Sequence, residues 1–73
     1  MAIVDVKTEI TGNVWKIVKA VGDAIDEDEP VMILESMKME IPVLSTDGGK
    51  VAEILVKEKE SVSEGQELVL LET

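Results

Sequence analysis

The chain has 73 residues, enough for one small domain, and it contains neither cysteine nor histidine. Disulfides are therefore excluded, as is nearly every transition-metal site, structural zinc included. Sixteen acidic residues against seven basic ones give a net charge of −9, which disfavours binding to nucleic acid or to an anionic membrane. No apolar stretch reaches the length of a membrane span, and the first residues lack the pattern of a signal peptide. We expect a cytoplasmic protein whose partners are other proteins.

Short segments of apolar residues follow one another along the chain and predict β-strands. Valine, isoleucine and leucine dominate these segments, and Gly, Pro, Asp and Ser gather between them, as in turns. Only VAEILVKEKE, taken alone, is also compatible with a helix. The pattern predicts an all-β fold. In chain order the segments are Val4 to Val6, VWKIVKAV at 14–21, VMILE at 31–35, IPVL at 41–44, VAEILV at 51–56 and LVLLE at 68–72.

The two halves of the chain repeat one another when the sequence is shifted by 37 residues. The shift places Gly12 on Gly49, Val14 on Val51 and Leu34 on Leu71 without a gap. Each copy, approximately 2–35 and 39–72, is too small to bury its own apolar face, so the copies should pack about a quasi-twofold axis. With four short strands per copy, the sequence predicts one domain over residues 1–73, an eight-stranded flattened barrel or two-sheet sandwich.

The segment VMILESMKMEIPVL at 31–44 joins the two copies. Fourteen residues are too long for one strand in so small a domain, so the chain should reverse near Met37 and Lys38. Tight hairpin turns favour Asn and Gly, and a Met-Lys pair at the tip therefore implies a local cost kept for a reason other than folding. Under the 37-residue shift both chain termini fall at the position of this turn, which predicts that Lys38 and the termini lie at opposite ends.

A hairpin tip of this composition has a simple structural interpretation, in which Lys38 is solvated and the methionines fill gaps. Met37 and Met39, however, stand at i and i+2 about the lysine and should leave soft apolar surface beside an amine. Such surface adapts well to a partner, so we expect another protein to recognise the turn. An unmodified β module that only binds a partner remains an alternative.

The hexapeptide ESMKME, midway between two β repeats, resembles the Ala-Met-Lys-Met biotin attachment motif of biotinyl domains. The resemblance extends over residues 12–72 and implies the barrel-sandwich hybrid of biotinyl and lipoyl domains, with the lysine on an exposed hairpin. It implies that a biotin protein ligase joins biotin to Lys38 through an amide, with Met37 and Met39 as flanking recognition residues. Glu35, Ser36 and Glu40 are weaker candidates for contact with the ligase. No catalytic residue and no metal site is expected.

The function that this resemblance implies is that of a biotin carboxyl carrier without catalytic activity of its own. The arm on Lys38 would carry a carboxyl group, as carboxybiotin, from a biotin carboxylase to a carboxyltransferase acting on an acyl-CoA or a 2-oxo acid. Tethering raises the effective concentration of the arm at both active sites. We expect the isolated domain to be monomeric.

The closest alternative within the resemblance is a lipoyl carrier. In lipoyl domains the residue before the lysine is typically Asp and the residue after it Ala or Val, so Met37 and Met39 favour biotin. Ser36 stands where biotinyl domains more often have alanine. The chain also lacks the thumb insertion of the bacterial acetyl-CoA carboxylase subtype, which favours a carrier of another carboxylase or a free-standing attachment protein.

Two further features receive structural interpretations. Trp15, the single aromatic residue, is expected to be a core or sheet-rim anchor because an isolated aromatic forms no cage. The acidic run at 26–29 lacks the ligand spacing of a calcium loop and is expected to be a solvated turn, as is KEKE at 57–60. Asp28 stands where the second copy has Gly65, at a turn position that an aspartate tolerates at some cost.

Overall fold

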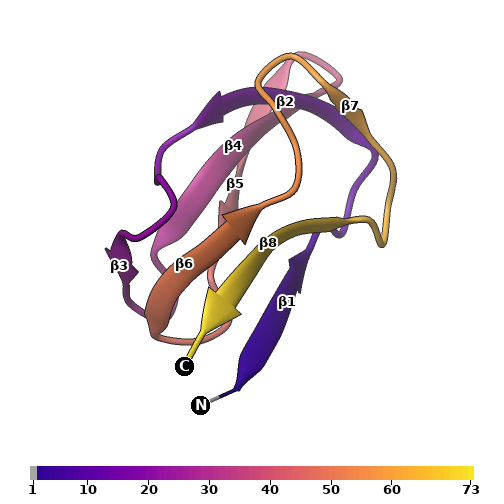
Figure 1. The fold of residues 1–73 in the computed structure, drawn as a ribbon. Coiled ribbons are helices and arrows are strands. Elements are labelled where there is room, and N and C mark those ends of the chain that lie inside the picture. Colours follow the sequence, from indigo (N-terminus) through magenta and orange to yellow (C-terminus); the bar gives the residue numbers. More distant parts are fainter. Residues whose placement is uncertain (1) are drawn as a thin grey trace.

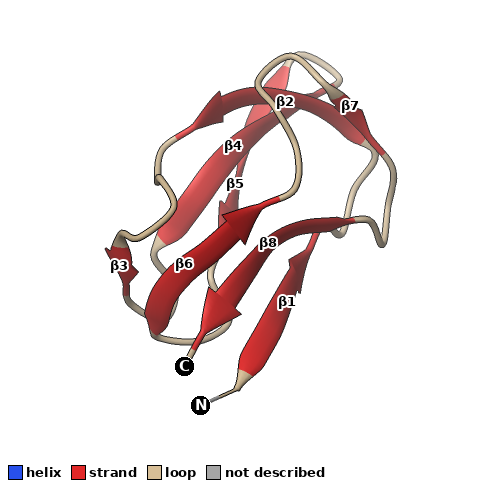
Figure 2. Cartoon of the chain, viewed as in Figure 1, coloured by secondary structure: helices blue, strands red, loops and turns tan. Residues whose placement is uncertain are grey.

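The computed structural model describes residues 2–73, which form eight strands in two four-stranded antiparallel sheets (Figures 1 and 2). One sheet has the order β1-β8-β6-β3 and the other the order β5-β4-β2-β7. The predicted all-β, eight-stranded fold is therefore confirmed. The strands are β1 (Ile3–Lys7), β2 (Gly12–Ile17), β3 (Ala24–Ile25), β4 (Pro30–Ser36), β5 (Met39–Leu44), β6 (Gly49–Ile54), β7 (Ser61–Val62) and β8 (Glu67–Glu72).

The two sheets are related by the internal repeat. A shift of 37 residues converts β1, β2, β3 and β4 into β5, β6, β7 and β8, and so converts one sheet order into the other. The register repeats as well, since Val14 pairs with Leu34 and Val51 pairs with Leu71. Each sheet takes strands from both copies. Neither copy can therefore form its sheet without the other, as expected for repeats that share a core.

The core lies between the sheets and consists of aliphatic side chains from both copies. Equivalent residues are buried together: Leu34 and Leu71 are fully buried, and Val14 and Val51 nearly so. Alternation sends the side chains of Val14 and Val51 inward and those of their neighbours outward, whereas β4 and β8 also bury adjacent residues, Val31 with Met32 and Leu68 with Val69. Burial of one such side chain contributes about 1.5–3 kcal/mol. The buried apolar set is Val6, Val14, Ile25, Val31, Met32, Leu34, Val51, Val56, Val62, Leu68, Val69 and Leu71.

The turns after the first strand of each copy also match. The buried hydroxyl of Thr8 donates to the Ile10 carbonyl at 2.8 Å, and the buried hydroxyl of Ser45 donates to the Asp47 carbonyl at 2.6 Å. Each hydroxyl also accepts a hydrogen bond from the backbone N–H of the same residue to which it donates. Serine and threonine turns of this kind satisfy buried polar groups locally. The two copies thus use similar side-chain chemistry in these equivalent turns.

The termini and the lysine hairpin lie at opposite ends of the elongated molecule, as the repeat predicts (Figure 1). Ala2 and Thr73 exchange two backbone hydrogen bonds, at 3.1 and 2.9 Å. This pair is the counterpart, under the 37-residue shift, of the pair between Met39 and Ser36 at the base of the hairpin turn. The longest dimension of the molecule is 37 Å. Residues 2–73 contain no helix long and apolar enough to cross a membrane.

Candidate functional site

The hairpin between β4 and β5 presents Lys38 at its tip. Ser36 pairs with Met39, which leaves Met37 and Lys38 as the two residues of the turn. Their φ angles are +51° and +65°, so both lie in the left-handed region that a type I′ turn requires. A non-glycine residue in this region costs roughly 1–2 kcal/mol. The predicted reversal is confirmed, and so is its unfavourable turn chemistry.

The side chains at the tip are exposed. Met37 is 92% exposed and Met39 61%, far more than methionines usually are in a packed domain. Lys38 is exposed between them, and it forms no salt bridge with any of residues 2–73. The site therefore offers a primary amine on a flexible stem, flanked by polarisable apolar surface. A covalently attached acyl group fits this arrangement, because nothing in the described part of the chain covers the amine.

The other candidate residues lie at the base of the turn. Glu35 and Glu40 face each other across the β4–β5 ladder, and both are exposed. Like charges directly opposite one another in a sheet are destabilising. Ser36 is half-buried, and its hydroxyl donates to the Thr11 carbonyl at 3.1 Å, which ties the hairpin to the segment before β2. The structure thus brings the six residues predicted from ESMKME together on one hairpin.

Gly12 positions the base of the hairpin. A Cβ atom at this residue would lie 2.6 Å from the Glu35 carbonyl oxygen, closer than side-chain carbons approach backbone oxygens. Its repeat counterpart Gly49 is equally crowded by the Glu72 carbonyl. Glycine at these positions lets the start of β2 pass close to the end of β4, and the start of β6 pass close to the end of β8.

Trp15 does not lie in the core, and this part of its predicted role is wrong: its side chain is 47% exposed. The residue falls in a β-bulge, since the β2–β4 register shifts between Val14 and Lys16. A bulge inserts one extra residue into a strand and redirects side chains near it. The corresponding bulge in β6 holds Ala52. The pairing register could not be read from the apolar period alone.

Trp15 lines a shallow hollow of about 320 Å³, together with Asn13, Val14, Glu35 and Lys59. Sequence reasoning missed the contributions of Asn13 and Lys59, because the KEKE segment was interpreted only as a solvated loop. The loop between β6 and β7 instead runs along β2: the Lys59 N–H donates to the Val14 carbonyl at 2.6 Å. Comparing the two copies could have revealed the position, since Lys59 stands where the first copy has Gly22.

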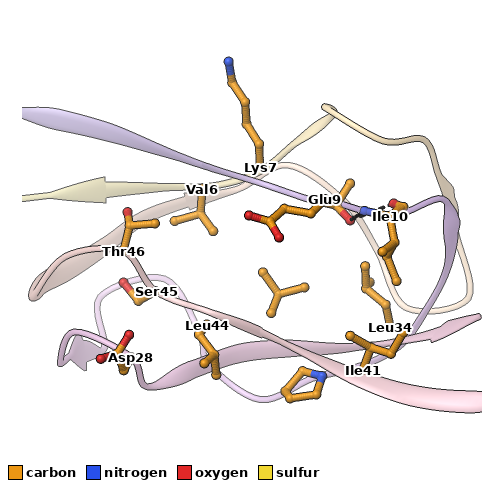
Figure 3. Close-up of a pocket in the computed structure, with 13 residues that line it drawn as sticks. Val6, Lys7, Glu9, Ile10, Asp28, Leu34, Ile41, Leu44, Ser45 and Thr46 are labelled. Atoms are coloured by element: carbon orange, nitrogen blue, oxygen red, sulfur yellow. Dashed lines mark hydrogen bonds between the residues drawn. The ribbon is translucent and has the colours of Figure 1, made fainter.

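A second cavity, of about 370 Å³, opens between β1 and β5, the edge strands of the two sheets. Figure 3 shows the Glu9 carboxylate directed toward its interior and the Lys7 side chain directed away from it. Leu34 and Ile41 form an apolar wall. None of the turn residues Met37, Lys38 and Met39 lines this groove.

The acidic run at 26–29 forms a turn in which Asp28 adopts a φ of +68°, matching Gly65 at +86°. Within residues 2–73 a salt bridge of 2.6 Å joins Lys19 to Glu29. The hydrogen bond from Lys19 and one from the Asp26 N–H lower the pKa of the Glu29 carboxyl, and the same ion pair raises the pKa of the Lys19 ammonium.

Comparison with known proteins agrees with this geometry. A family described as "Biotin-requiring enzyme", the biotin/lipoyl family, matches residues 1–71. The "Biotin/lipoyl attachment protein" of Bacillus subtilis is 46% identical over 67 residues, which are 92% of this chain and 89% of that protein. The "Biotinylated protein TB7.3 homolog" of Mycobacterium leprae is 36% identical over 92% of this chain and 94% of its own length.

Among solved structures, the urea carboxylase of Kluyveromyces lactis contains a region with a TM-score of 0.91 and 37% identity. That match covers 97% of this chain but only 6% of the carboxylase chain. The relatives thus include both small proteins of similar length and one module of a large protein. The family match, the eight-stranded fold and the exposed lysine hairpin together show that the chain belongs to the biotin/lipoyl attachment domain family, whose members are non-catalytic carriers.

Proposed function

We propose that this chain is a biotin carboxyl carrier, with Lys38 as the residue to which biotin is attached. The observation that carries the proposal is the exposed Lys38 amine at the tip of a strained two-residue turn, between Met37 and Met39. Folding alone would favour Asn and Gly at these turn positions. Recognition of the turn by a modifying enzyme gives the unfavourable residues a purpose.

The chemistry of attachment assigns a role to the lysine side chain. Its Nζ atom, once deprotonated, attacks the acyl carbon of a biotinyl adenylate, an amide bond forms and AMP leaves. No group at the tip is placed as a base, so a biotin protein ligase supplies that function. Bound biotin provides a ring nitrogen that accepts and releases a CO₂ unit. The domain itself holds the arm at one end and leaves its methylene stem free to swing.

The partners of such a carrier are a biotin carboxylase and a carboxyltransferase, which act on the arm in turn. The similarity to a region of a urea carboxylase supports this assignment, because that protein carries a domain of the same fold within a carboxylase chain. The net charge of −9 favours partner surfaces rich in lysine and arginine around the two active sites. We place the protein in the cytoplasm, where the ligase and its ATP are available.

A lipoyl carrier is the second candidate, and the name of the Bacillus subtilis relative, which gives both attachments, favours testing it. The fold does not separate the two, because the resemblance that implies biotin also covers lipoyl domains. The residues at the tip favour biotin, since Met37 and Met39 depart from the Asp and the Ala or Val that flank a lipoyl lysine. An unmodified binding module is the third outcome.

The decisive experiment is intact mass spectrometry after incubation with a biotin protein ligase, biotin and ATP, in parallel with a lipoate ligase reaction. Lys38→Arg keeps the charge and the length of the side chain and serves as the matched variant. We expect one biotin adduct on the wild type, none on Lys38→Arg, and little lipoylation. Folding of both proteins is checked by circular dichroism.

Each other outcome has a definite meaning. A lipoyl adduct without a biotin adduct would replace the proposal with the lipoyl carrier. A folded wild type that takes neither group would indicate the binding module. An adduct that persists in Lys38→Arg would move the attachment to another lysine.

A further inference from the structure

The hollow beside β2 lies near the lysine hairpin and has two large side chains in its lining, Trp15 and Lys59. Under the 37-residue shift, the equivalent positions hold Ala52 in place of Trp15 and Gly22 in place of Lys59. The backbones match closely: the bulge, the register and the positive φ all recur. The equivalent backbone therefore forms with neither the indole nor the ammonium group in place. Both large side chains thus occur in the copy-specific positions near Lys38 and are replaced by small residues at the equivalent positions.

Lys59 occupies its position at a cost. Its φ is +73°, whereas the equivalent Gly22 adopts +95° without strain. Within residues 2–73 the Lys59 ammonium forms no salt bridge that would offset the strain of this conformation. Strained non-glycine residues concentrate at functional sites. Trp15 beside it is 47% exposed, so about half of the residue remains open to solvent.

We propose that the hollow lined by Trp15, Glu35 and Lys59 is a resting site for the biotin arm carried on Lys38, an inference that rests on the proposed function. Glu35 belongs both to the hollow and to the hairpin, and it lies one residue before Ser36, where the turn begins. At about 3.3 Å per residue, the hollow begins within roughly 7 Å of the turn. A lysine side chain extended by the valeryl chain of biotin is longer than this distance.

The lining complements the chemistry of biotin. The indole of Trp15 offers an apolar face for the hydrocarbon chain and the thioether ring. The ureido group has one carbonyl oxygen and two N–H donors, which match the Lys59 ammonium and the Glu35 carboxylate. Asn13 accepts a hydrogen bond from Ser61 through its side-chain oxygen at 2.9 Å, so its amide nitrogen keeps its donors. The dithiolane of a lipoyl group has no such donors and would use only the indole.

A weak site is sufficient because the arm is tethered. A short flexible tether gives an effective concentration on the order of 1 mM, which half-populates a contact of millimolar intrinsic affinity. The arm would thus divide its time between the hollow and solution. It would leave the hollow for a partner active site at little cost.

Trp15 is the only tryptophan, so its fluorescence reports directly on the hollow. The experiment measures acrylamide quenching of Trp15 in the unmodified protein and in the biotinylated protein, each checked by intact mass. We expect biotinylation to lower the quenching constant by up to about half, the limit set by half-occupancy of the site. Lys59→Gly, which copies Gly22 and relieves the positive φ, should lose most of this protection without loss of folding. Lys57→Gln removes a lysine from the same loop outside the hollow and should keep the protection.

A second readout allows Trp15 itself to be changed. Avidin must capture biotin that has left the hollow, so Trp15→Ala and Lys59→Gly should each speed capture from biotinylated protein by roughly 2-fold, the factor expected for a half-occupied site. Lys57→Gln should leave the rate unchanged.

The outcomes separate this inference from the proposed function. Full biotinylation with quenching and avidin capture equal to those of a freely exposed arm would overturn the resting site and leave the carrier intact. The resting site would also be overturned if Lys59→Gly were biotinylated more slowly than the wild type while biotinylation protected Trp15 from quenching equally in both proteins. That result would assign the hollow to contact with the ligase. Absence of any biotin adduct would overturn both.

Discussion

At the scale of single residues, the tip of the hairpin is held in a conformation that costs stability. Among residues 2–73, four non-glycine residues have positive φ: Asp28, Met37, Lys38 and Lys59. Two of them, Asp28 and Lys59, stand where the other copy has glycine, so the repeat itself shows which residue folding prefers. Met37 and Lys38 have no such counterpart, because the chain termini take the equivalent place.

Met37→Asn should therefore stabilise the domain while impairing its modification. Asparagine suits the first central position of a type I′ turn, and we expect the free energy of unfolding to rise by about 0.5–1 kcal/mol. Loss of the exposed thioether should at the same time slow biotinylation. Urea denaturation and the initial rate of ligation measure the two effects.

The matched variant is Asp28→Gly, which relieves a similar positive φ far from the turn and copies Gly65. It should stabilise the domain by a comparable amount and leave the ligation rate unchanged. If Met37→Asn were ligated as fast as Asp28→Gly, the methionine would have no part in recognition.

At the scale of elements, the sequence predicted the longer strands and the repeat. Both alternation and the 37-residue shift can be seen in the sequence without knowing which strands pair. The two-residue strands β3 and β7 fall in segments interpreted as turns, since two residues are too few to show alternation. The expectation of four strands per copy was nevertheless correct. The bulge at Trp15 was invisible, because it depends on pairing between β2 and β4 rather than on β2 alone.

Gly12→Ala and Gly49→Ala test how element packing supports the hairpin. Both new Cβ atoms would meet a backbone carbonyl, so we expect each substitution to destabilise the domain by roughly 1–3 kcal/mol. Only Gly12 lies beside the hairpin, where the clash is with the Glu35 carbonyl. Gly12→Ala should therefore slow the ligation of Lys38 as well, and Gly49→Ala should not.

Gly48→Ala is the control, because its Cβ would lie 3.7 Å from the nearest atom, at ordinary contact distance. It should change stability by no more than about 0.5 kcal/mol. Thermal unfolding and ligation rates, measured on the three variants below their melting temperatures, separate the two effects. Equal slowing by Gly12→Ala and Gly49→Ala would show that ligation follows global stability rather than hairpin position.

At the scale of the whole molecule, the repeat places the paired chain ends and the lysine hairpin at opposite ends. Ala2 and Thr73 pair at one end, and the β4–β5 hairpin, whose turn holds Lys38, lies at the other. The sequence predicted this polarity from the repeat alone, whereas the hollow at Trp15 required the folded loop between β6 and β7. What the sequence could not supply was the side-to-side contact of segments separated by more than forty residues.

The charge of the molecule adds a pH dependence that one ion pair makes testable. The lowered pKa of Glu29 means that its contribution to stability is present near neutral pH and is lost as pH falls through the pKa of the folded state, from about pH 5 downward. The raised pKa of Lys19 means that its contribution is lost on the alkaline side. Glu29→Gln removes the pair but copies Gln66, whose side-chain oxygen accepts the Ser63 N–H as Glu29 accepts that of Asp26. The variant should be less stable than the wild type at neutral pH, and the difference should vanish in acid.

Glu27→Gln removes the same charge from the same loop without breaking the Lys19 pair, and it serves as the control. Because the chain carries a net charge of −9, loss of one carboxylate in itself reduces repulsion, and this variant should be as stable as the wild type or slightly more so. Urea denaturation followed by circular dichroism across acid and neutral pH gives both curves. If the stability difference between the wild type and Glu29→Gln stayed the same in acid, the ion pair would not be its source. Packing of the Glu29 side chain in its turn would then account for the difference.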